Sequence, residues 1–514
     1  MTRFATLPEM IAAQPHEAVA LMAPARDPLP YGALAQLVRH TEQQLRAHGL
    51  ARSDRVALVL ENGPEMACAF VAVAAACTAA PLNPAYRGEE FAFYLSDLGA
   101  NALIVAQGSE SAAIEAARGL GMLVLQLRAD LAAPAGSFAL HAAADPPARA
   151  QPATPDAAPA GATDVALILH TSGTTSRPKI VPLSHGNLCA SARNVSHTLQ
   201  LTPSDCGLHV MPMFHIHGLI AGLLAPLSVG SRVFCTPGFH ALRFFGWLRE
   251  SHATWYTAVP TMHQAILARA PHNRDVIREH PLRFLRSSSS SMPPQVIAEL
   301  EQVFAAPLIE SYGMTEATHQ MASSPLPPGR RIPGSVGPAA GPQIAIMDER
   351  GQRLASGQVG EVVIRGDNVT AGYENNPKAN AEAFVDGWFR TGDQGVLDAD
   401  GYLTLTGRLK EIINRGGEKI SPREIDEVLM DHPAVAQAVT FAMPHPKLGE
   451  EVAAAVVLRE SAPPADEAGL RTFVASRVAD YKVPRRILIL AEIPKGATGK
   501  LQRIGLAAKL GLAS

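Results

Sequence analysis

Thr171-Ser-Gly-Thr-Thr-Ser-Arg-Pro-Lys179 directly follows the apolar run 165–169 and precedes a short strand-like segment and a helix that Ser184 is placed to cap. Most of its positions are glycine or carry a hydroxyl or ammonium donor. Hydroxyls and backbone N–H groups donate to phosphate oxygens, Gly173 allows close backbone approach, and Lys179 adds positive charge. The stretch therefore predicts a phosphate-binding loop at the end of a strand. It lacks the GxxxxGK[ST] pattern of a Walker loop, and an ordinary serine- and threonine-rich surface loop is the alternative.

Strands and helices alternate on the N-terminal side of this loop. Residues 55–60 and 102–105 read as apolar strands, with an alanine-rich helix and a second helix from Glu89 between them. Such alternation predicts parallel strands joined by helical crossovers, and hence an α/β fold. The alanine- and proline-rich residues 132–163 predict an irregular connection, and the glycine- and proline-rich residues 325–372 predict short antiparallel strands.

The chain is long enough for at least two domains, because 514 residues exceed what one hydrophobic core usually organises. The sequence pattern changes after Gly407. A charged loop there leads to a predicted helix at 422–430, strands at 436–441 and 452–458, a helix at 466–478 and a strand at 486–490. We therefore expect a large N-terminal domain of layered α/β subdomains over residues 1–407. A small α/β domain follows over residues 408–514.

Composition narrows the environment and the partners. A net charge of -3, with 18% charged residues, gives no electrostatic reason to expect nucleic acid or an anionic membrane surface. The five cysteines are odd in number and lack CxxC spacing, which argues against a disulfide framework or a zinc cluster and favours a reducing compartment. The N-terminus lacks a signal-peptide apolar core, and the apolar run 66–82 predicts a buried helix rather than a membrane span. These features predict a cytoplasmic protein.

Four further motifs follow the loop: Tyr312-Gly-Met-Thr-Glu316, Thr391-Gly-Asp393, Gly407-Arg-Leu-Lys-Glu411 and Pro494-Lys-Gly-Ala-Thr-Gly-Lys500. In this order and at these separations the five motifs resemble the signatures of the adenylate-forming superfamily, which includes acyl-CoA synthetases, luciferases and the adenylation domains of peptide synthetases. The resemblance covers roughly residues 165–503. It implies a mobile C-terminal domain, with ATP, Mg²⁺ and coenzyme A as cofactors. Ser176 and Ile180 depart from it, because they stand where the family usually has glycine.

The resemblance implies a nucleotide site. Its members are Thr171, Ser172, Gly173, Thr174, Thr175, Lys179, Ser289, Glu310, Ser311, Tyr312, Gly313, Met314, Asp393 and Arg408. The Tyr312 ring would stack on adenine, the Thr315 hydroxyl would donate to the α-phosphate, and Glu316 would be a metal ligand for Mg²⁺. Asp393 would accept hydrogen bonds from the ribose hydroxyls. Without the other motifs, these side chains would be interpreted as ordinary core or solvated residues.

Catalysis, by the same resemblance, involves Lys500, Glu316, Thr315 and His215. Lys500 would swing over the nucleotide, and the small domain would then rotate about the hinge Lys410. Gly416 and Gly417 would leave space for the pantetheine arm of coenzyme A, a plain turn being the alternative. His215 lies in Met213-Phe-His-Ile-His-Gly218, which resembles the family's aromatic gate. A metal-binding His-x-His pair is the alternative, although no third ligand is evident nearby.

The acid pocket is predicted to be short and polar, with His319, Ser289 and His263 as its residues. An alkyl chain would leave buried polar groups unpaired there, at a cost of about 1–3 kcal/mol each. The segments around these residues resemble the oxalyl-CoA synthetase branch of the superfamily, so oxalate or another small dicarboxylate is the expected substrate. Arg286 either contacts that dianion or is a surface residue before a serine-rich loop.

We therefore expect an ATP-dependent acyl-CoA ligase whose partners are a small carboxylic acid, ATP and coenzyme A, with no nucleic acid and no membrane insertion. A homodimer is left open. The alternatives are a ligase for medium-chain fatty or aryl acids, and an enzyme of the same fold with another acceptor. A binding protein that has lost catalysis is a further alternative, but Lys179, Glu316, Asp393, Arg408 and Lys500 are all present.

Overall fold

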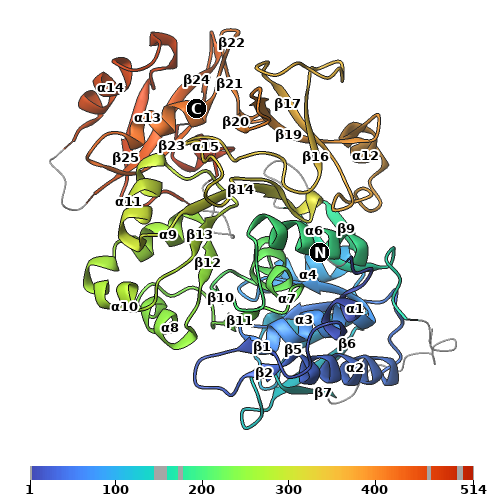
Figure 1. The fold of residues 1–514 in the computed structure, drawn as a ribbon. Coiled ribbons are helices and arrows are strands. Elements are labelled where there is room, and N and C mark those ends of the chain that lie inside the picture. Colours follow the sequence, from blue (N-terminus) through green and yellow to red (C-terminus); the bar gives the residue numbers. More distant parts are fainter. Residues whose placement is uncertain (1–2, 144–158, 172–177, 460–464, 495–501, 513–514) are drawn as a thin grey trace.

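The computed structural model describes residues 3–143, 159–171, 178–459, 465–494 and 502–512. Four β-sheets organise these residues. Three of the sheets lie before residue 409, and the fourth forms the C-terminal part at the top left of Figure 1. Mixed sheets with helical crossovers confirm the predicted α/β class. A large N-terminal part is followed by a smaller C-terminal one, as predicted.

A seven-stranded sheet carries the predicted phosphate loop, in the order β7-β6-β5-β3-β4-β8-β9. Its central strands are parallel, as predicted, and antiparallel strands close both edges. The strands are β3 (Arg55–Val59), β4 (Thr78–Pro81), β5 (Ala102–Ala106), β6 (Leu123–Ala129), β7 (Phe138–Ala142), β8 (Val165–His170) and β9 (Ile180–Ser184). The crossover helices are α3 (Pro64–Ala76), α4 (Gly88–Leu98) and α5 (Ala112–Gly119).

One prediction for this region is wrong in part, because residues 132–163 are not irregular throughout. Strand β7 pairs antiparallel with β6 inside that stretch. Phe138 and Leu140 alternate with more exposed residues and enter the core, which is the period of a half-buried strand. The alanine- and proline-rich composition concealed this alternation.

An eight-stranded sheet supplies most of the predicted site, in the order β15-β14-β13-β12-β10-β11-β1-β2. All its pairings are parallel except those of β2 and β15 at the two ends. The strands are β1 (Val19–Met22), β2 (Leu29–Pro30), β10 (Cys206–His209), β11 (Arg232–Cys235), β12 (Trp255–Ala258), β13 (Phe284–Ser287), β14 (Leu308–Met314) and β15 (His319–Ser323). Side chains on β12 and β13 are therefore buried on both faces, as is usual in parallel sheets.

Helices pack on these two sheets and between them (Figure 1). They are α1 (Leu7–Ala12), α2 (Tyr31–Ala47), α6 (His185–Thr198), α7 (Ala225–Leu227), α8 (Phe244–Ser251), α9 (Pro260–Leu267), α10 (Arg274–Glu279), α11 (Pro294–Phe304), the π-helix η1 (Gly218–Leu224), and the 3₁₀ turns η2 (Ala270–His272) and η3 (Thr315–Ala317). Ser184 caps α6 as predicted, because its hydroxyl accepts a hydrogen bond from the backbone N–H of Asn187 at 3.1 Å.

The third sheet is antiparallel, which confirms the prediction for the glycine- and proline-rich region. Its strands are β16 (Gln343–Met347), β17 (Gly360–Arg365), β18 (Phe384–Val385), β19 (Trp388–Leu397) and β20 (Leu403–Arg408), with α12 (Pro377–Ala383) beside them. Two residues of the predicted nucleotide set lie in this sheet, because β19 carries Asp393 and β20 ends at Arg408.

The fourth sheet begins four residues after β20 ends. Its strands are β21 (Ile413–Arg415), β22 (Glu418–Ile420), β23 (Val435–His445), β24 (Gly449–Leu458) and β25 (Arg486–Ile489). Its helices are α13 (Pro422–Met430), α14 (Glu467–Ala475), the 3₁₀ turn η4 (Asp480–Lys482) and α15 (Leu506–Lys509). This change of sheet falls near the expected domain boundary at 407/408, which stays a prediction.

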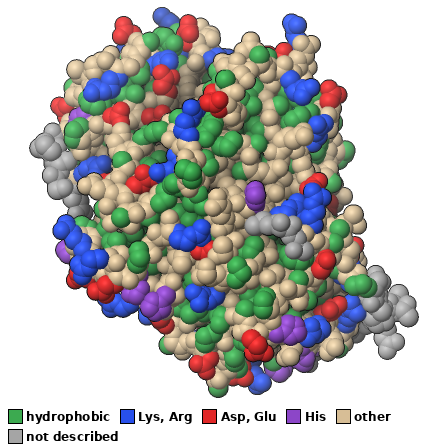
Figure 2. Space-filling view, viewed as in Figure 1, with side chains coloured by type: hydrophobic (Ala, Val, Ile, Leu, Met, Phe, Trp, Pro, Cys, Tyr) green, Lys and Arg blue, Asp and Glu red, His purple; other side chains and the backbone are tan. Residues whose placement is uncertain are grey.

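The core and the surface agree with a globular enzyme. All five cysteines are free and buried. Among the described residues, none of the helices combines the length and the apolar character that a bilayer crossing needs. Figure 2 shows acidic and basic side chains interspersed over the face in view, without a patch of a single sign.

Candidate nucleotide and acid-binding site

The ends of the predicted phosphate loop are held together at the edge of the seven-stranded sheet. The Thr171 backbone N–H donates to the Lys179 carbonyl at 2.9 Å, and the Lys179 backbone N–H donates to the Thr171 hydroxyl at 3.1 Å. The Lys179 ammonium lies 4.3 Å from the centroid of the Tyr373 ring. Ser172, Gly173, Thr174 and Thr175 lie outside the described residues. Ile180 pairs with His170 in β9, so a strand residue occupies the position where the family has glycine.

Three motif residues from different strands meet at the predicted ribose end. The Tyr312 hydroxyl donates to Oδ2 of Asp393, and Arg408 Nε donates to Oδ1 of the same carboxylate at 2.9 Å. Asp393 and Arg408 are direct partners across the pairing of β19 with β20. Asp393 is buried and its negative charge raises the pKa of Arg408. Asp393 is therefore held as a fixed acceptor and is not a solvated surface residue.

Glu316 occupies the 3₁₀ turn after β14, where its side chain is buried. The Tyr373 hydroxyl donates to its Oε1 at 2.8 Å, and burial raises the pKa of Glu316. Mg²⁺ in phosphotransfer sites usually takes one or two carboxylates and completes its coordination with phosphate oxygens and water. Among the described residues no group of three His, Cys, Asp or Glu side chains could hold a metal alone. The single buried carboxylate of Glu316 is therefore consistent with a Mg²⁺ ion that binds together with the phosphates of a nucleotide.

Gly313 connects the nucleotide residues to the acid residues. The pairing of β14 with β15 shifts register between Tyr312 and Gly313, and a Cβ on Gly313 would lie 1.6 Å from the His319 carbonyl oxygen. Only glycine permits this close approach of two backbones. Thr318 and His319 have positive φ angles of 48° and 95°, so the backbone between the two strands is strained. Residues 312–319 therefore form one rigid hairpin that reaches both parts of the site.

Arg286 forms the centre of a polar cluster on an interior strand of the eight-stranded sheet. It is fully buried on β13. Its NH1 donates to Nε2 of His217 at 3.3 Å and to the Thr257 hydroxyl at 3.2 Å. Its NH2 donates to Nε2 of His319 at 3.0 Å and to Oε1 of Gln320 at 3.1 Å. Burial lowers the pKa of Arg286 to about 9, so the side chain is still protonated at neutral pH.

The two histidines of this cluster lie together and extend it toward the serine loop. The His217 and His319 rings stack with centroids 4.8 Å apart. His217 Nδ1 lies 3.0 Å from the Ser289 hydroxyl, and its Nε2 lies 2.7 Å from the Thr257 hydroxyl. Ser289 has a φ angle of 74°, another strained position. We call Arg286, His217, His319, Ser289 and Thr257 the arginine–histidine cluster.

Of the predicted acid residues, His319 and Ser289 belong to this cluster, whereas the ring of His263 is engaged behind it. His263 is fully buried on α9, with Nδ1 2.9 Å from the Tyr256 hydroxyl and Nε2 3.1 Å from the Arg286 carbonyl. Burial lowers the pKa of His263 to about 4. The structure therefore places His263 as a support for β13. Its assignment to the acid pocket stays a prediction without a contact.

His217, and not the predicted His215, reaches the cluster. His215 is half-buried beside Phe214, with ring centroids 5.4 Å apart. His217 directly precedes the π-helix η1, an irregularity that is frequent at functional sites. Sequence reasoning missed His217, and it left Arg286 open. The only signal for Arg286 in the sequence is that it follows the apolar pair Phe284 and Leu285, which does not show whether Arg286 itself is buried.

The predicted residues of the C-terminal part lie apart from this centre. Lys500 is outside the described residues. Lys410 is exposed between the third and fourth sheets. Gly416 and Gly417 have φ angles of 60° and 101° in the tight turn that joins β21 to β22, which is the structure expected of a plain turn and does not test the coenzyme A assignment.

One contact network joins the C-terminal part to the nucleotide strands. Arg423 of α13 donates to the Leu405 carbonyl at 3.0 Å. Glu310 of β14 faces Arg423 and Glu427, and burial raises its pKa to about 7. Ser311 and Met314 lie on the same strand as Glu310, and Thr315 opens the turn that carries Glu316. The structure thus gathers the predicted residues of β14 on one continuous segment.

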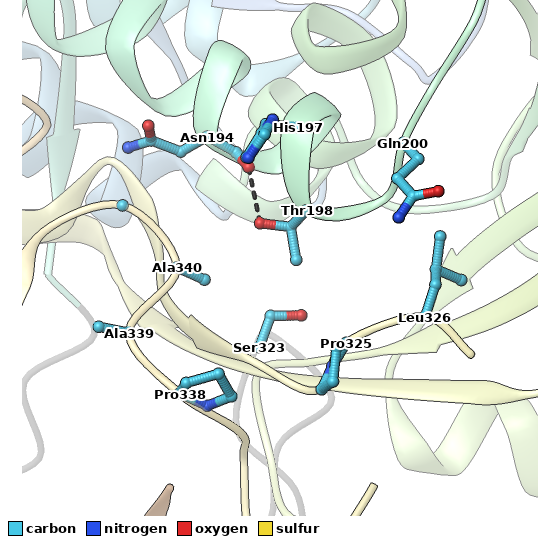
Figure 3. Close-up of a pocket in the computed structure, with 11 residues that line it drawn as sticks. Asn194, His197, Thr198, Gln200, Ser323, Pro325, Leu326, Pro338, Ala339 and Ala340 are labelled. Atoms are coloured by element: carbon cyan, nitrogen blue, oxygen red, sulfur yellow. Dashed lines mark hydrogen bonds between the residues drawn. The ribbon is translucent and has the colours of Figure 1, made fainter. Parts of the chain in front are cut away.

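A separate cavity of about 310 Å³ lies between the end of α6 and the segments that follow β15 (Figure 3). Asn194, His197 and Thr198 line one side, and Ser323, Pro325 and Ala340 line the other. None of the predicted site residues lines it. Gln320 separates it from Arg286, because its amide nitrogen donates to the Thr198 hydroxyl at 3.1 Å and to the Ala340 carbonyl at 3.0 Å.

Comparisons with known proteins agree with the motifs. The family described as AMP-binding enzyme matches residues 8–374, and the AMP-binding enzyme C-terminal domain matches residues 424–500. An oxalate–CoA ligase of Arabidopsis thaliana is 47% identical over 88% of each chain. A sulfoacetate–CoA ligase of Cupriavidus necator is 37% identical over 93% of this chain and 92% of its own. The crystal structure of ATP-bound MatB from Rhodopseudomonas palustris has a TM-score of 0.87 at 28% identity and covers 99% of both chains.

Proposed function

The chain belongs to the AMP-binding enzyme family, as an AMP-forming acyl-CoA synthetase, and from this premise we propose that it converts oxalate to oxalyl-CoA with ATP and coenzyme A. The observation that carries the proposal is the arginine–histidine cluster, which His319 connects to the strand hairpin that also holds Tyr312 and Glu316. A small acid that carries a second negative charge suits this cluster. The similarity to an oxalate–CoA ligase and a sulfoacetate–CoA ligase supports the same choice.

In the first half-reaction, a carboxylate oxygen of the acid attacks the α-phosphorus of ATP, and pyrophosphate leaves. Two anions must meet, so positive charge has to lower the barrier. We assign this role to Lys179 and Lys500. Asp393, held by Arg408 and Tyr312, would accept hydrogen bonds from the ribose and fix the nucleotide. Mg²⁺ bound at Glu316 would neutralise phosphate charge.

In the second half-reaction, the sulfur of coenzyme A attacks the acyl carbon, and AMP leaves with the electron pair of the broken C–O bond. We propose that residues 408–514 rotate about Lys410 between the two steps, which withdraws Lys500 and presents the turn of Gly416 and Gly417 to the thiol. The exposure of Lys410 between two sheets supports a hinge there. His215 would lie beside the entering thiol, at the start of the segment that leads to η1.

A ligase for fatty or aryl acids is less consistent with the cluster. An alkyl chain or a ring placed against Arg286 would leave a buried charge without solvation, which costs several kcal/mol. The buried free cysteines support the proposed cytoplasmic location. A homodimer stays a proposal.

The proposal is tested by acid-dependent AMP release with ATP, Mg²⁺ and coenzyme A. Oxalate, malonate, acetate, octanoate and coumarate are compared at equal concentration, and the thioester product is identified by mass spectrometry. We expect oxalate to give the highest kcat/KM. A clear preference for octanoate or coumarate would contradict the proposed substrate, and AMP release without a thioester would contradict the proposed acceptor.

A further inference from the structure

Arg286 carries a positive charge that no acidic side chain compensates in the part of the chain that the structure describes. Its four NH1 and NH2 contacts are to histidine, threonine and glutamine atoms, and its Nε has no hydrogen-bond partner. Its side chain is 0% exposed. An unpaired charge at such depth is costly, and buried arginines are usually paired with a carboxylate or a phosphate.

Arg286 also decides which nitrogen of each neighbouring histidine carries a proton. A guanidinium can only donate hydrogen bonds, so Nε2 of His217 and Nε2 of His319 must both accept from it. In the neutral rings the proton then lies on Nδ1. His217 Nδ1 consequently donates to the Ser289 hydroxyl, which leaves the Ser289 O–H group to donate onward.

We propose that the arginine–histidine cluster is the receptor for the second carboxylate of the acid substrate, with Arg286 as a positioning residue that acts through His217 and His319. This inference rests on the proposed function. The Ser289 hydroxyl donates a hydrogen bond to the distal carboxylate, and His217, with the His319 ring stacked on it, holds that hydroxyl in place. The guanidinium behind them supplies the balancing charge. The class of substrate is a short carboxylic acid with a second anionic group, and oxalate is the smallest member.

Charge and geometry both favour a dianion over a monoanion of the same size. One carboxylate of the substrate is consumed by the attack on ATP, so only a second anionic group can compensate Arg286. The strained backbone at Ser289 holds this donor in a fixed position. Preorganised donors of this kind stabilise an ion without reorganisation at the moment of binding.

Oxalate and oxamate provide a direct test, because oxamate replaces one carboxylate by a neutral amide of the same size. The readout is acid-dependent ATP–pyrophosphate exchange, from which kcat, KM and the ratio of the two kcat/KM values are obtained. We expect wild type to favour oxalate at least 100-fold. In Arg286→Met the kcat/KM for oxalate should fall about 100-fold, mainly through KM, while that for oxamate changes less than about 3-fold.

Arg286→Lys keeps a positive charge and should recover part of the oxalate preference, although it cannot contact both histidines. Arg283→Met is the matched control, since Arg283 precedes the same strand and pairs with Asp205 at 2.5 Å. It should leave the ratio unchanged. The KM for ATP should stay within a factor of two in every variant, which a general loss of structure would not allow.

If Arg286→Met leaves the ratio of the two kcat/KM values unchanged, for example because both acids lose activity equally, the inference is overturned and the proposed function stays intact. If wild type shows no oxalate-dependent exchange at all, the proposed function itself fails. Circular dichroism establishes whether Arg286→Met folds. If Arg286→Met does not fold, Ser289→Ala is tested in its place, because it removes the half-buried hydroxyl that donates to the distal carboxylate. An oxalate to oxamate ratio that does not fall about tenfold in Ser289→Ala would then overturn the inference.

Discussion

Two arginines at opposite ends of the site are held in contrasting ways. Arg408 pairs with Asp393 at 2.9 Å, and its side chain is 56% exposed. Arg286 is fully buried and has no carboxylate partner among the described residues. Both lie within contact distance of motif segments, and both are protonated at neutral pH. They differ in whether the protein itself supplies the balancing charge.

This difference indicates what each end recognises. The ribose offers neutral hydroxyls, so the nucleotide end needs a fixed acceptor, and Arg408 orients one by compensating Asp393. The acid end keeps its positive charge unpaired, so that the ligand supplies the counter-ion. If this view is correct, changes at the nucleotide end lower the rates for all acids together, and only changes at the acid end alter the ratio of oxalate to oxamate.

The largest effect is expected for Lys500→Ala. Removing the ammonium that stabilises the charged transition state should lower the rate of adenylate formation by about 1000-fold. The rate falls equally for oxalate and oxamate, because Lys500 is assigned to the nucleotide and not to the distal carboxylate. Single-turnover measurements of adenylate formation test this. Adenylate formation at the wild-type rate would contradict the assigned role, and an altered ratio would break the separation of the two ends.

Asp393→Asn should lower kcat/KM for ATP by about 100-fold, since it leaves Arg408 unpaired and weakens the acceptor for the ribose. The oxalate to oxamate ratio should not change. Asp398→Asn is the control, because Asp398 lies in the exposed turn after β19 and contacts Arg330 at 3.5 Å. Steady-state kinetics with varied ATP measure both variants. A loss confined to oxalate would show that the two ends are coupled.

The nucleotide end could be predicted from the sequence, and the acid end only in part. Tyr312, Asp393 and Arg408 belong to motifs with fixed spacing, so their convergence was expected although they lie on three strands. His319 and Ser289 were expected as well, because they follow directly after a motif or lie in a serine-rich loop. The predicted strands and helices of the parallel sheets and of the C-terminal part were also largely correct.

The residues that sequence reasoning missed or left open share a physical cause. His217, Thr257 and Arg286 lie on separate segments, and only the strand order of the eight-stranded sheet brings them together. Their individual types are common on surfaces, so nothing local marks them as partners. Burial is the deciding property, and it follows from the central position of β13, which the sequence does not specify. For the same reason the sequence did not show the contact of the His263 ring with the Arg286 carbonyl, and the assignment of His263 to the acid pocket stays a prediction.

Gly417→Ala tests the C-terminal part, which lies apart from both ends. Its φ angle of 101° is unfavourable for any residue with a Cβ, although open space surrounds the position. We expect thioester formation from preformed adenylate to slow about tenfold, while ATP–pyrophosphate exchange and the acid ratio stay unchanged. Rapid-quench analysis of the two half-reactions measures this. Equal slowing of both half-reactions would instead indicate that the turn has only a structural role.

The smallest effect is expected for Glu310→Gln, and it extends the comparison to a buried acid. Burial raises the pKa of Glu310 to about 7 against an ordinary value of 4.5, so the folded protein holds a proton there that the unfolded chain releases between these pH values. Wild-type stability therefore falls as pH rises from about 4.5 to 7 and then levels off, whereas glutamine has no such dependence. Arg423 faces the half-buried carboxyl and partly stabilises its charged form. We therefore expect the free energy of unfolding of Glu310→Gln to gain about 1 kcal/mol relative to wild type as the pH rises from 5 to 8. Chemical unfolding at both pH values measures the gain. If it were absent, Arg423 would compensate Glu310 as fully as Asp393 compensates Arg408.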